Sequence, residues 1–212
     1  MRHNKTMLFV LILVVLASLF TGCVKAVEAE EIDLTTYDYS HEPVATIELE
    51  TGEVIKVSLL TKIAPNTVNN FITLAMDGFY DGTTFHRVMK DFMIQGGDPL
   101  GTGLGGPGYS IKGEFNNNGF ANGLKHTRGV ISMARTRDKD SAGSQFFIMH
   151  KDTASLDGDY ASFGVVTEGL EVVDRIAETP VDKNDKPIDP VIIKTISIEL
   201  NGYEQDSPVK FK

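Results

Sequence analysis

The chain has 212 residues, of which 42% are hydrophobic and 23% are charged, a composition typical of a globular protein with one hydrophobic core. Its formal net charge of −9 at pH 7 opposes both the phosphate backbone of nucleic acids and anionic lipid headgroups. We therefore expect no nucleic acid among its partners.

The first 22 residues have the pattern of a secretory signal. Arg2 and Lys5 precede an apolar run over residues 7–20, which is shorter than the roughly 20 residues of a transmembrane helix. The residues Leu-Phe-Thr-Gly-Cys follow at positions 19–23. We predict a lipoprotein signal peptide over residues 1–22, with an uncleaved membrane anchor as the alternative.

Cys23 is the only cysteine, so the chain can form no intramolecular disulfide. Its place directly after a Thr-Gly pair resembles that of the lipid-bearing cysteine of bacterial lipoproteins, in which more than one acyl chain gives stable membrane anchoring. We therefore predict lipidation at Cys23 and an extracytoplasmic protein held on the bacterial cell membrane. A free thiol in an ordinary signal peptide is the alternative. Loss of residues 1–22 leaves 18 basic against 29 acidic side chains, a net charge of −11.

Residues 23–42 are acidic, and their scattered apolar residues follow no sustained period. This pattern predicts a lipid-anchored tether with little order.

From residue 43 the pattern predicts a folded domain that extends to residue 202. Apolar residues alternate over 45–49 and again over 55–59, on either side of a Glu-Thr-Gly-Glu turn, which is typical of a β-hairpin. Pro65 then begins a helical stripe of apolar residues, and Gly78 ends it.

Short strand-like runs between glycine-rich turns dominate the rest of the domain. With the hairpin they make eight strands, and a second helical stripe over residues 170–177 ends before Thr179-Pro180. Strands and helices do not alternate as in a parallel α/β fold. We therefore predict a mainly β protein, a closed eight-stranded antiparallel β-barrel capped by two α-helices, followed by a C-terminal tail over residues 203–212.

Three patterns that could indicate a catalytic, cofactor or metal site lack the neighbouring residues or spacing that such a site requires. Gly101 to Gly106 match the dinucleotide-binding pattern G-x-G-x-x-G, but Pro107-Gly108 follow where a helix would have to begin. Gly-Ser-Gln at 143–145 lacks the second glycine of a nucleophile elbow. The histidines have no metal-ligand spacing, so we predict no metal site and no cofactor.

Arg87 is harder to explain, because it stands among apolar residues at strand spacing. A guanidinium is rarely buried without a partner, which could be a structural carboxylate, a bound anion or a reacting substrate.

Seven ordered blocks between residues 85 and 164 carry a family resemblance. They are F-H-R-V at 85–88, D-F-M-I-Q-G-G-D at 91–98, G-T-G at 101–103, K-H-T-R-G at 125–129, S-M-A at 132–134, G-S-Q-F-F-I at 143–148 and L-D-G-D-Y-A-S-F-G at 156–164. In order and spacing they resemble the cyclophilin peptidyl-prolyl cis-trans isomerases, and the likeness covers about residues 43–200.

The resemblance implies catalysis of rotation about X-Pro peptide bonds, here in secreted or surface proteins. The barrier of roughly 18–20 kcal/mol arises from amide conjugation, so the reaction needs no nucleophile, metal or cofactor. Arg87 would donate a hydrogen bond to the twisted amide, an interaction stronger in the transition state than in the planar ground state. A salt bridge at the rim is the alternative role for Arg87. A proline-binding module or holdase without catalysis is the alternative function.

By the same resemblance, further residues would bind the substrate. Gln95 would orient the Arg87 guanidinium, and the Arg135 backbone would bind the peptide before proline. A three-residue loop over 90–92 would pair Gln95 with Arg87, whereas a two-residue turn would pair Ile94 with it, and only the resemblance selects the first. The apolar members of the set could equally be core residues. The full predicted set is Phe92, Met93, Gln95, Ala134, Arg135, Gln145, Phe147, Leu156 and Tyr160.

The sequence departs from the best-known animal cyclophilins at the rim of this site. Ser155 stands where they carry tryptophan, Arg135 where they carry asparagine and Tyr160 where they carry histidine. We therefore expect cyclosporin, the cyclic peptide inhibitor of the family, to bind weakly. The expected partners are proline-containing polypeptides and, through the lipid on Cys23, a membrane; we expect a monomer.

Overall fold

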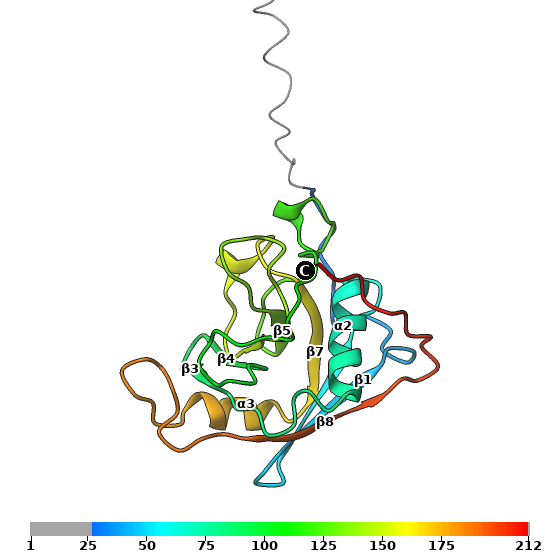
Figure 1. Ribbon diagram of the computed structural model, residues 1–212. Coiled ribbons are helices and arrows are strands. Elements are labelled where there is room, and N and C mark those ends of the chain that lie inside the picture. The colour runs from blue at the N-terminus through cyan, green and yellow to red at the C-terminus, as the bar shows by residue number, and fades with distance from the viewer. Residues whose placement is uncertain (1–26, 212) are drawn as a thin grey trace, which may run out of the picture.

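The structure is a computed structural model that describes residues 27–211 (Figure 1). The predicted signal peptide and Cys23 lie outside the described residues. Within them, all eight predicted strands and both predicted helices are present. The strands are β1 (Val44–Leu49), β2 (Val54–Leu59), β3 (Arg87–Met89), β4 (Met93–Gly96), β5 (Val130–Met133), β6 (Phe146–Met149), β7 (Ser162–Glu168) and β8 (Ile193–Glu199); the helices are α2 (Pro65–Met76) and α3 (Leu170–Ala177), with short 3-10 turns η1 (Asn116–Asn118) and η2 (Ala154–Leu156).

The eight strands form one antiparallel sheet in the order β3-β4-β6-β5-β7-β2-β1-β8. The sheet curls into a half-barrel, and among the described residues no ladder joins the edge strands β3 and β8. Only an isolated bridge between Thr84 and Ile192 and a few neighbouring backbone hydrogen bonds connect the two edges. The predicted closed barrel is therefore not confirmed. On its outer edge, β3 is bonded instead to the loop before β8, where the Val88 N–H donates to the Asp185 carbonyl at 2.7 Å.

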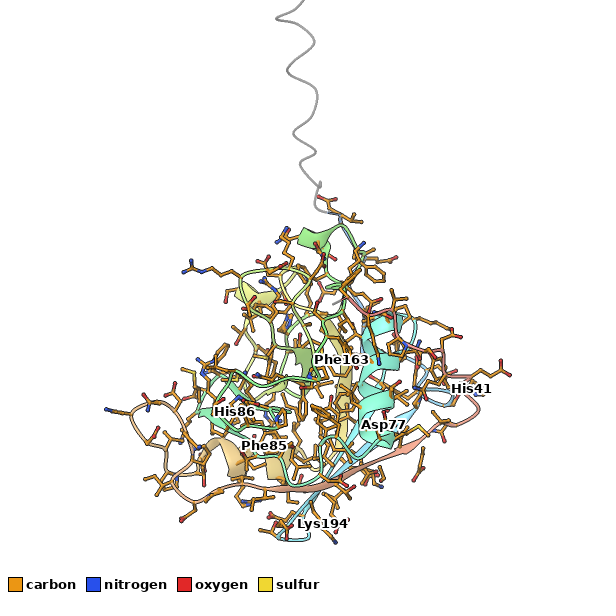
Figure 2. The ribbon with its side chains drawn as sticks, viewed as in Figure 1. His41, Asp77, Phe85, His86, Phe163 and Lys194 are labelled. Atoms are coloured by element: carbon orange, nitrogen blue, oxygen red, sulfur yellow. The ribbon has the colours of Figure 1, made fainter. Side chains whose placement is uncertain are left out.

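The inner face of the sheet and the two helices enclose an aromatic core. Phe71 of α2 lies 5.5 Å from Phe146 and 5.3 Å from Phe163, measured between ring centroids. Tyr80 and Phe85 complete this cluster, and all five side chains are buried. In Figure 2, Phe163 lies in the interior beside α2, while Phe85 and His86 lie towards the side of the molecule that carries β3 in Figure 1. The core therefore reaches β3, the strand that carries Arg87.

Residues 27–42, here called the N-terminal segment, pack against the domain, so the tether with little order that the sequence predicted is wrong for this stretch. The backbone N–H of Val27 donates to the carbonyl of Asn116 at 3.1 Å. The N–H of Ile32 donates to the carbonyl of Gly123 at 3.2 Å. These bonds fix the segment along a line between η1 and the loop before β5.

Side chains of the N-terminal segment alternate between the domain and solvent. Leu34, Tyr37 and Tyr39 pack on the smaller of the two hydrophobic clusters. The carboxylate of Glu42 is buried, and it accepts hydrogen bonds from the Tyr37 hydroxyl at 2.5 Å and from the Thr61 backbone N–H at 2.9 Å. The remaining acidic residues face water. The acidic composition therefore concealed an ordered segment, because all its acidic residues except Glu42 lie on the exposed face.

The C-terminal tail also packs on the domain, along α2. The Tyr203 hydroxyl donates to the Asn69 side chain at 2.9 Å, and Val209 N–H donates to the Asn66 side chain at 2.7 Å. Figure 1 shows the tail returning to the end of the molecule at which the N-terminal segment begins. Within residues 27–211, no helix combines the length and apolarity needed to cross a bilayer.

Candidate active site

A groove of about 350 Å³ opens over β3, β4 and the loops beside them. Nine of the ten residues that the sequence placed in the site lie around it, and the tenth, Gln145, lies in the adjoining depression. The groove also takes in four residues that the sequence analysis did not name, namely His86, Thr102, Gly103 and Asn184. Of these, His86, Thr102 and Gly103 stand inside blocks that carried the resemblance, which was the available signal, whereas Asn184 belongs to a distant loop.

The apolar half of the groove is built from two strands and the turn η2. Met93 and Phe147 are buried, and the Tyr160 ring stands edge-on to Phe147 with 5.7 Å between centroids. Phe92 and Leu156 are half-buried beside them. An apolar ring the size of proline could occupy this half.

His126 supports the two aromatic walls from behind. Its ring stacks on Phe147 at 6.0 Å and meets Tyr160 edge-on at 6.3 Å. Its ring nitrogens lie 3.1 Å from the Asp157 carboxylate and 3.1 Å from the Ser132 hydroxyl. Burial lowers the pKa of His126, against the opposing effect of the Asp157 carboxylate. The His126 ring behind the aromatic walls is therefore neutral at pH 7.

Arg87 supplies the charge in the polar half of the groove. The structure pairs it with Gln95 across β3 and β4, which confirms the register that the three-residue loop predicted. Its Nη2 donates to the Met89 sulfur at 3.0 Å, and its Nε lies 3.8 Å from the Asp185 carboxylate. The side chain is 43% exposed, so the guanidinium can reach a ligand in the groove.

Gln95 was expected to orient the Arg87 guanidinium, but no hydrogen bond joins the two side chains among the described residues. The Gln95 amide instead donates to the Gln145 side chain at 2.9 Å, and Gln145 donates to the Gly105 carbonyl at 2.9 Å. The strand register placed Gln95 opposite Arg87 but could not show that Gln145, just before β6, accepts a hydrogen bond from the Gln95 amide. Gln95 thus connects the groove to the glycine-rich loop.

That glycine-rich loop, residues 99–108, is organised by Asp98. The carboxylate accepts hydrogen bonds from Leu100 N–H at 2.8 Å and from Thr102 N–H at 2.9 Å. Burial acts to raise the pKa of Asp98, but these and two further backbone donors outweigh it and lower the pKa. A protein carboxylate therefore takes backbone N–H groups of this loop that a bound phosphate would need.

Arg135 lies at the rim between the groove and the adjoining depression. Its guanidinium stacks over the Tyr160 ring at 4.6 Å and over the Phe115 ring at 5.1 Å, and its Nε donates to the Asp159 carbonyl at 2.9 Å. The side chain is thus held against the Tyr160 wall, and Arg135 lines both the groove and the adjoining depression. Within residues 27–211 no cluster of three or more possible metal ligands occurs.

Comparisons with known proteins agree with one another. The family model described as cyclophilin-type peptidyl-prolyl cis-trans isomerase/CLD matches residues 45–198. A peptidyl-prolyl cis-trans isomerase of Helicobacter pylori is 45% identical over 157 residues, covering 73% of this chain and 90% of the relative. Peptidyl-prolyl cis-trans isomerase B of Bacillus subtilis is 48% identical over 135 residues, covering 64% of this chain and 91% of the relative.

A solved structure shows the same fold. The cyclophilin of Cryptosporidium parvum, crystallised in the presence of the dipeptide Ala-Pro, superposes with a TM-score of 0.68 at 37% identity, covering 74% of this chain and 98% of that structure.

Proposed function

The chain belongs to the cyclophilin-type peptidyl-prolyl cis-trans isomerases, and from that premise we propose that it catalyses X-Pro rotation in secreted or surface proteins while anchored to the bacterial cell membrane by a lipid on Cys23. The isomerase activity follows from the family and its relatives. The observation that supports the proposed site is the position of Arg87 beside an apolar groove large enough for a proline ring.

The proposed mechanism uses the two halves of the groove for different purposes. The apolar walls of Met93, Phe147 and Tyr160 hold the proline ring, while the groups on the other side of the peptide bond can rotate. When the bond twists, conjugation is lost and the proline nitrogen becomes a better hydrogen-bond acceptor. Arg87, which is always protonated, donates to this nitrogen or to the displaced carbonyl. Since the interaction strengthens as the bond twists, it lowers the barrier rather than the ground state.

The first test concerns Arg87. We expect Arg87→Ala to lower the isomerase rate by about 10²-fold, as loss of one preorganised donor does at other sites, with a smaller change in peptide binding. Arg87→Lys keeps the charge but loses the planar fork, so it recovers only a small part of the rate. The measurements are kcat/KM on a short X-Pro peptide and Tm on the same preparation. An alanine variant with wild-type activity per folded molecule would contradict the role proposed for Arg87.

The second test concerns location. The proposal rests on Leu-Phe-Thr-Gly-Cys at residues 19–23, which precedes the described structure. We expect the protein in the membrane fraction, with an intact mass that shows acylated Cys23 as the first residue. Cys23→Ser is expected to leave that fraction or to be misprocessed, with unchanged isomerase activity. An unmodified N-terminus elsewhere in the chain would reject the anchor.

A further inference from the structure

The loop between α3 and β8, residues 180–190, borders the groove on the side of Arg87. Asn184 of this loop lines the groove, and the Lys186 ammonium donates to the Gly101 carbonyl at 3.3 Å. The loop therefore contacts the glycine-rich loop and flanks the reacting site, although it lies about 100 residues further along the chain than Arg87.

The α3–β8 loop has a defined internal structure. The Asp182 carboxylate accepts the backbone N–H of Asn184 at 2.8 Å and of Lys186 at 3.1 Å, and these two donors are the leading cause of its lowered pKa. The backbone closes with Asp182 N–H donating to the Lys186 carbonyl at 2.8 Å. At the tip, Asp185 has a φ of +63°, a left-handed conformation that is uncommon outside glycine and asparagine. The turn thus fixes the position of Asp185.

The tip of the loop is bonded to the strand that carries Arg87. Because β3 is an edge strand, the outward backbone N–H of Val88 has no partner in the sheet. It donates to the Asp185 carbonyl at 2.7 Å, a short bond that holds the loop against β3. The carboxylate of Asp185 also lies 3.8 Å from the Arg87 Nε. The side chains of both residues are somewhat less than half exposed.

We propose that Asp185 is a positioning residue for the isomerase reaction, which holds the Nε side of Arg87 so that the rest of the guanidinium faces the groove. The inference rests on the catalytic role proposed above for Arg87. Asp185 attracts the Nε side and Met89 accepts from Nη2, so two contacts restrict a long side chain that would otherwise occupy many rotamers. In this chain Asp185 takes the orienting role that the resemblance gave to Gln95, whose amide is bound to Gln145.

Two substitutions remove the Asp185 carboxylate without changing the backbone conformation of the loop. Asp185→Asn and Asp185→Gly both tolerate a positive φ, so the turn and its bond to Val88 are retained. Because an ion pair at this exposure is weak, we expect kcat on an X-Pro peptide to fall only about twofold to fivefold, with KM and Tm nearly unchanged. Asp189→Asn is the matched control, since it removes the same charge from an exposed position of the same loop. It is expected to keep the wild-type rate.

The decisive measurement is whether the effect of Asp185→Asn on the rate depends on the presence of Arg87. In an Arg87→Ala background, Asp185→Asn is expected to have no further effect on the rate. Raising the ionic strength is expected to bring the wild-type rate towards that of Asp185→Asn, because salt screens exposed ion pairs. The proposal is overturned by an unchanged or increased rate in both Asp185 variants, or by an equal loss with and without Arg87. If Arg87→Ala itself keeps the wild-type rate, the catalytic role proposed for Arg87 fails as well; if only the Asp185 variants do, this inference alone fails.

Discussion

His86 and Arg87 are consecutive residues at the groove, yet they differ in their access to water. The His86 residue is 6% exposed, and neither ring nitrogen has a hydrogen-bond partner among the described residues. Burial is the largest effect on its pKa and lowers it, so the ring is neutral at pH 7. A charged ring here would repel the neighbouring guanidinium, and burial prevents this.

Stability is expected to depend on these buried histidines below neutral pH. Burial lowers the pKa of His86 and His126 from the ordinary value of 6.5. As the pH falls through 6.5, the unfolded chain binds protons that the folded protein does not, so the free energy of unfolding decreases until the lowered pKa values are reached. We expect Tm to be steady above neutral pH and to fall between 6.5 and those values. His86→Phe, measured by thermal unfolding across the same range, is expected to show a shallower fall; identical slopes would reject this cause.

At the level of elements, the alternating strands and the helical stripes were predictable because each follows from local residues. The hairpin β1-β2 alternates cleanly, and Pro65 and Gly78 bracket α2. The groove was predictable only through the family resemblance, since the Arg87-Gln95 register depends on a loop whose length the residues left open.

Contacts between distant segments were not predictable from the sequence. Nothing near Gln95 indicates that Gln145 binds its amide, and nothing near Arg87 indicates that Asp185 approaches it. The same limit applies to the start of α2. Its N-cap position, Ala64, has no side chain able to cap the helix, so local signals leave the first turn unsatisfied.

Glu114 supplies that missing cap from 47 residues further along the chain than Thr67. Its buried carboxylate accepts the Asn66 N–H at 3.1 Å, the Thr67 N–H at 2.8 Å and the Thr67 hydroxyl at 2.7 Å. We expect Glu114→Ala to lower the free energy of unfolding by about 1–3 kcal/mol, because it leaves buried donors without acceptors. Glu114→Gln keeps one acceptor, so its free energy of unfolding is expected to lie between those of the wild type and Glu114→Ala. Denaturant midpoints measure this, with the exposed Glu204→Ala as control; equal midpoints for both alanine variants would contradict it.

At the scale of the whole molecule, the two ends of the chain extend the family domain. The family match covers residues 45–198, whereas the structure packs residues 27–42 and 203–211 on the same domain. In Figure 1 the C-terminal tail runs back towards the end of the molecule at which the N-terminal segment begins, and β3 and β4 lie at the side. If Cys23 carries the lipid, only residues 24–26 separate it from the packed segment, so the Cα atoms of Cys23 and Val27 can lie at most about 14 Å apart. The proposed anchor would therefore hold the domain close to the membrane.

The N-terminal segment also reaches the hydrophobic cluster that forms the back of the groove. Leu34, Tyr37 and Tyr39 pack on the cluster that includes Met93 and Phe147. Removal of the segment would expose apolar surface on that cluster and leave the Thr61 N–H without its carboxylate acceptor. A change at the N-terminus can thus act on the walls of the proline groove through packing alone.

We therefore expect a chain shortened to begin at residue 43 to be less stable and less active than one that begins at residue 27. A loss of about 1 kcal/mol shifts Tm by roughly 2–4 °C in a domain of this size, so a drop of at least a few degrees is expected. The isomerase rate per folded molecule is expected to fall as well, because the cluster that includes Met93 and Phe147 loses packing partners. Thermal unfolding and kcat/KM on an X-Pro peptide measure the two effects, and the chain beginning at residue 27 controls for loss of the signal and anchor. Equal Tm and rate in the two chains would show that the segment is the passive tether its composition suggested.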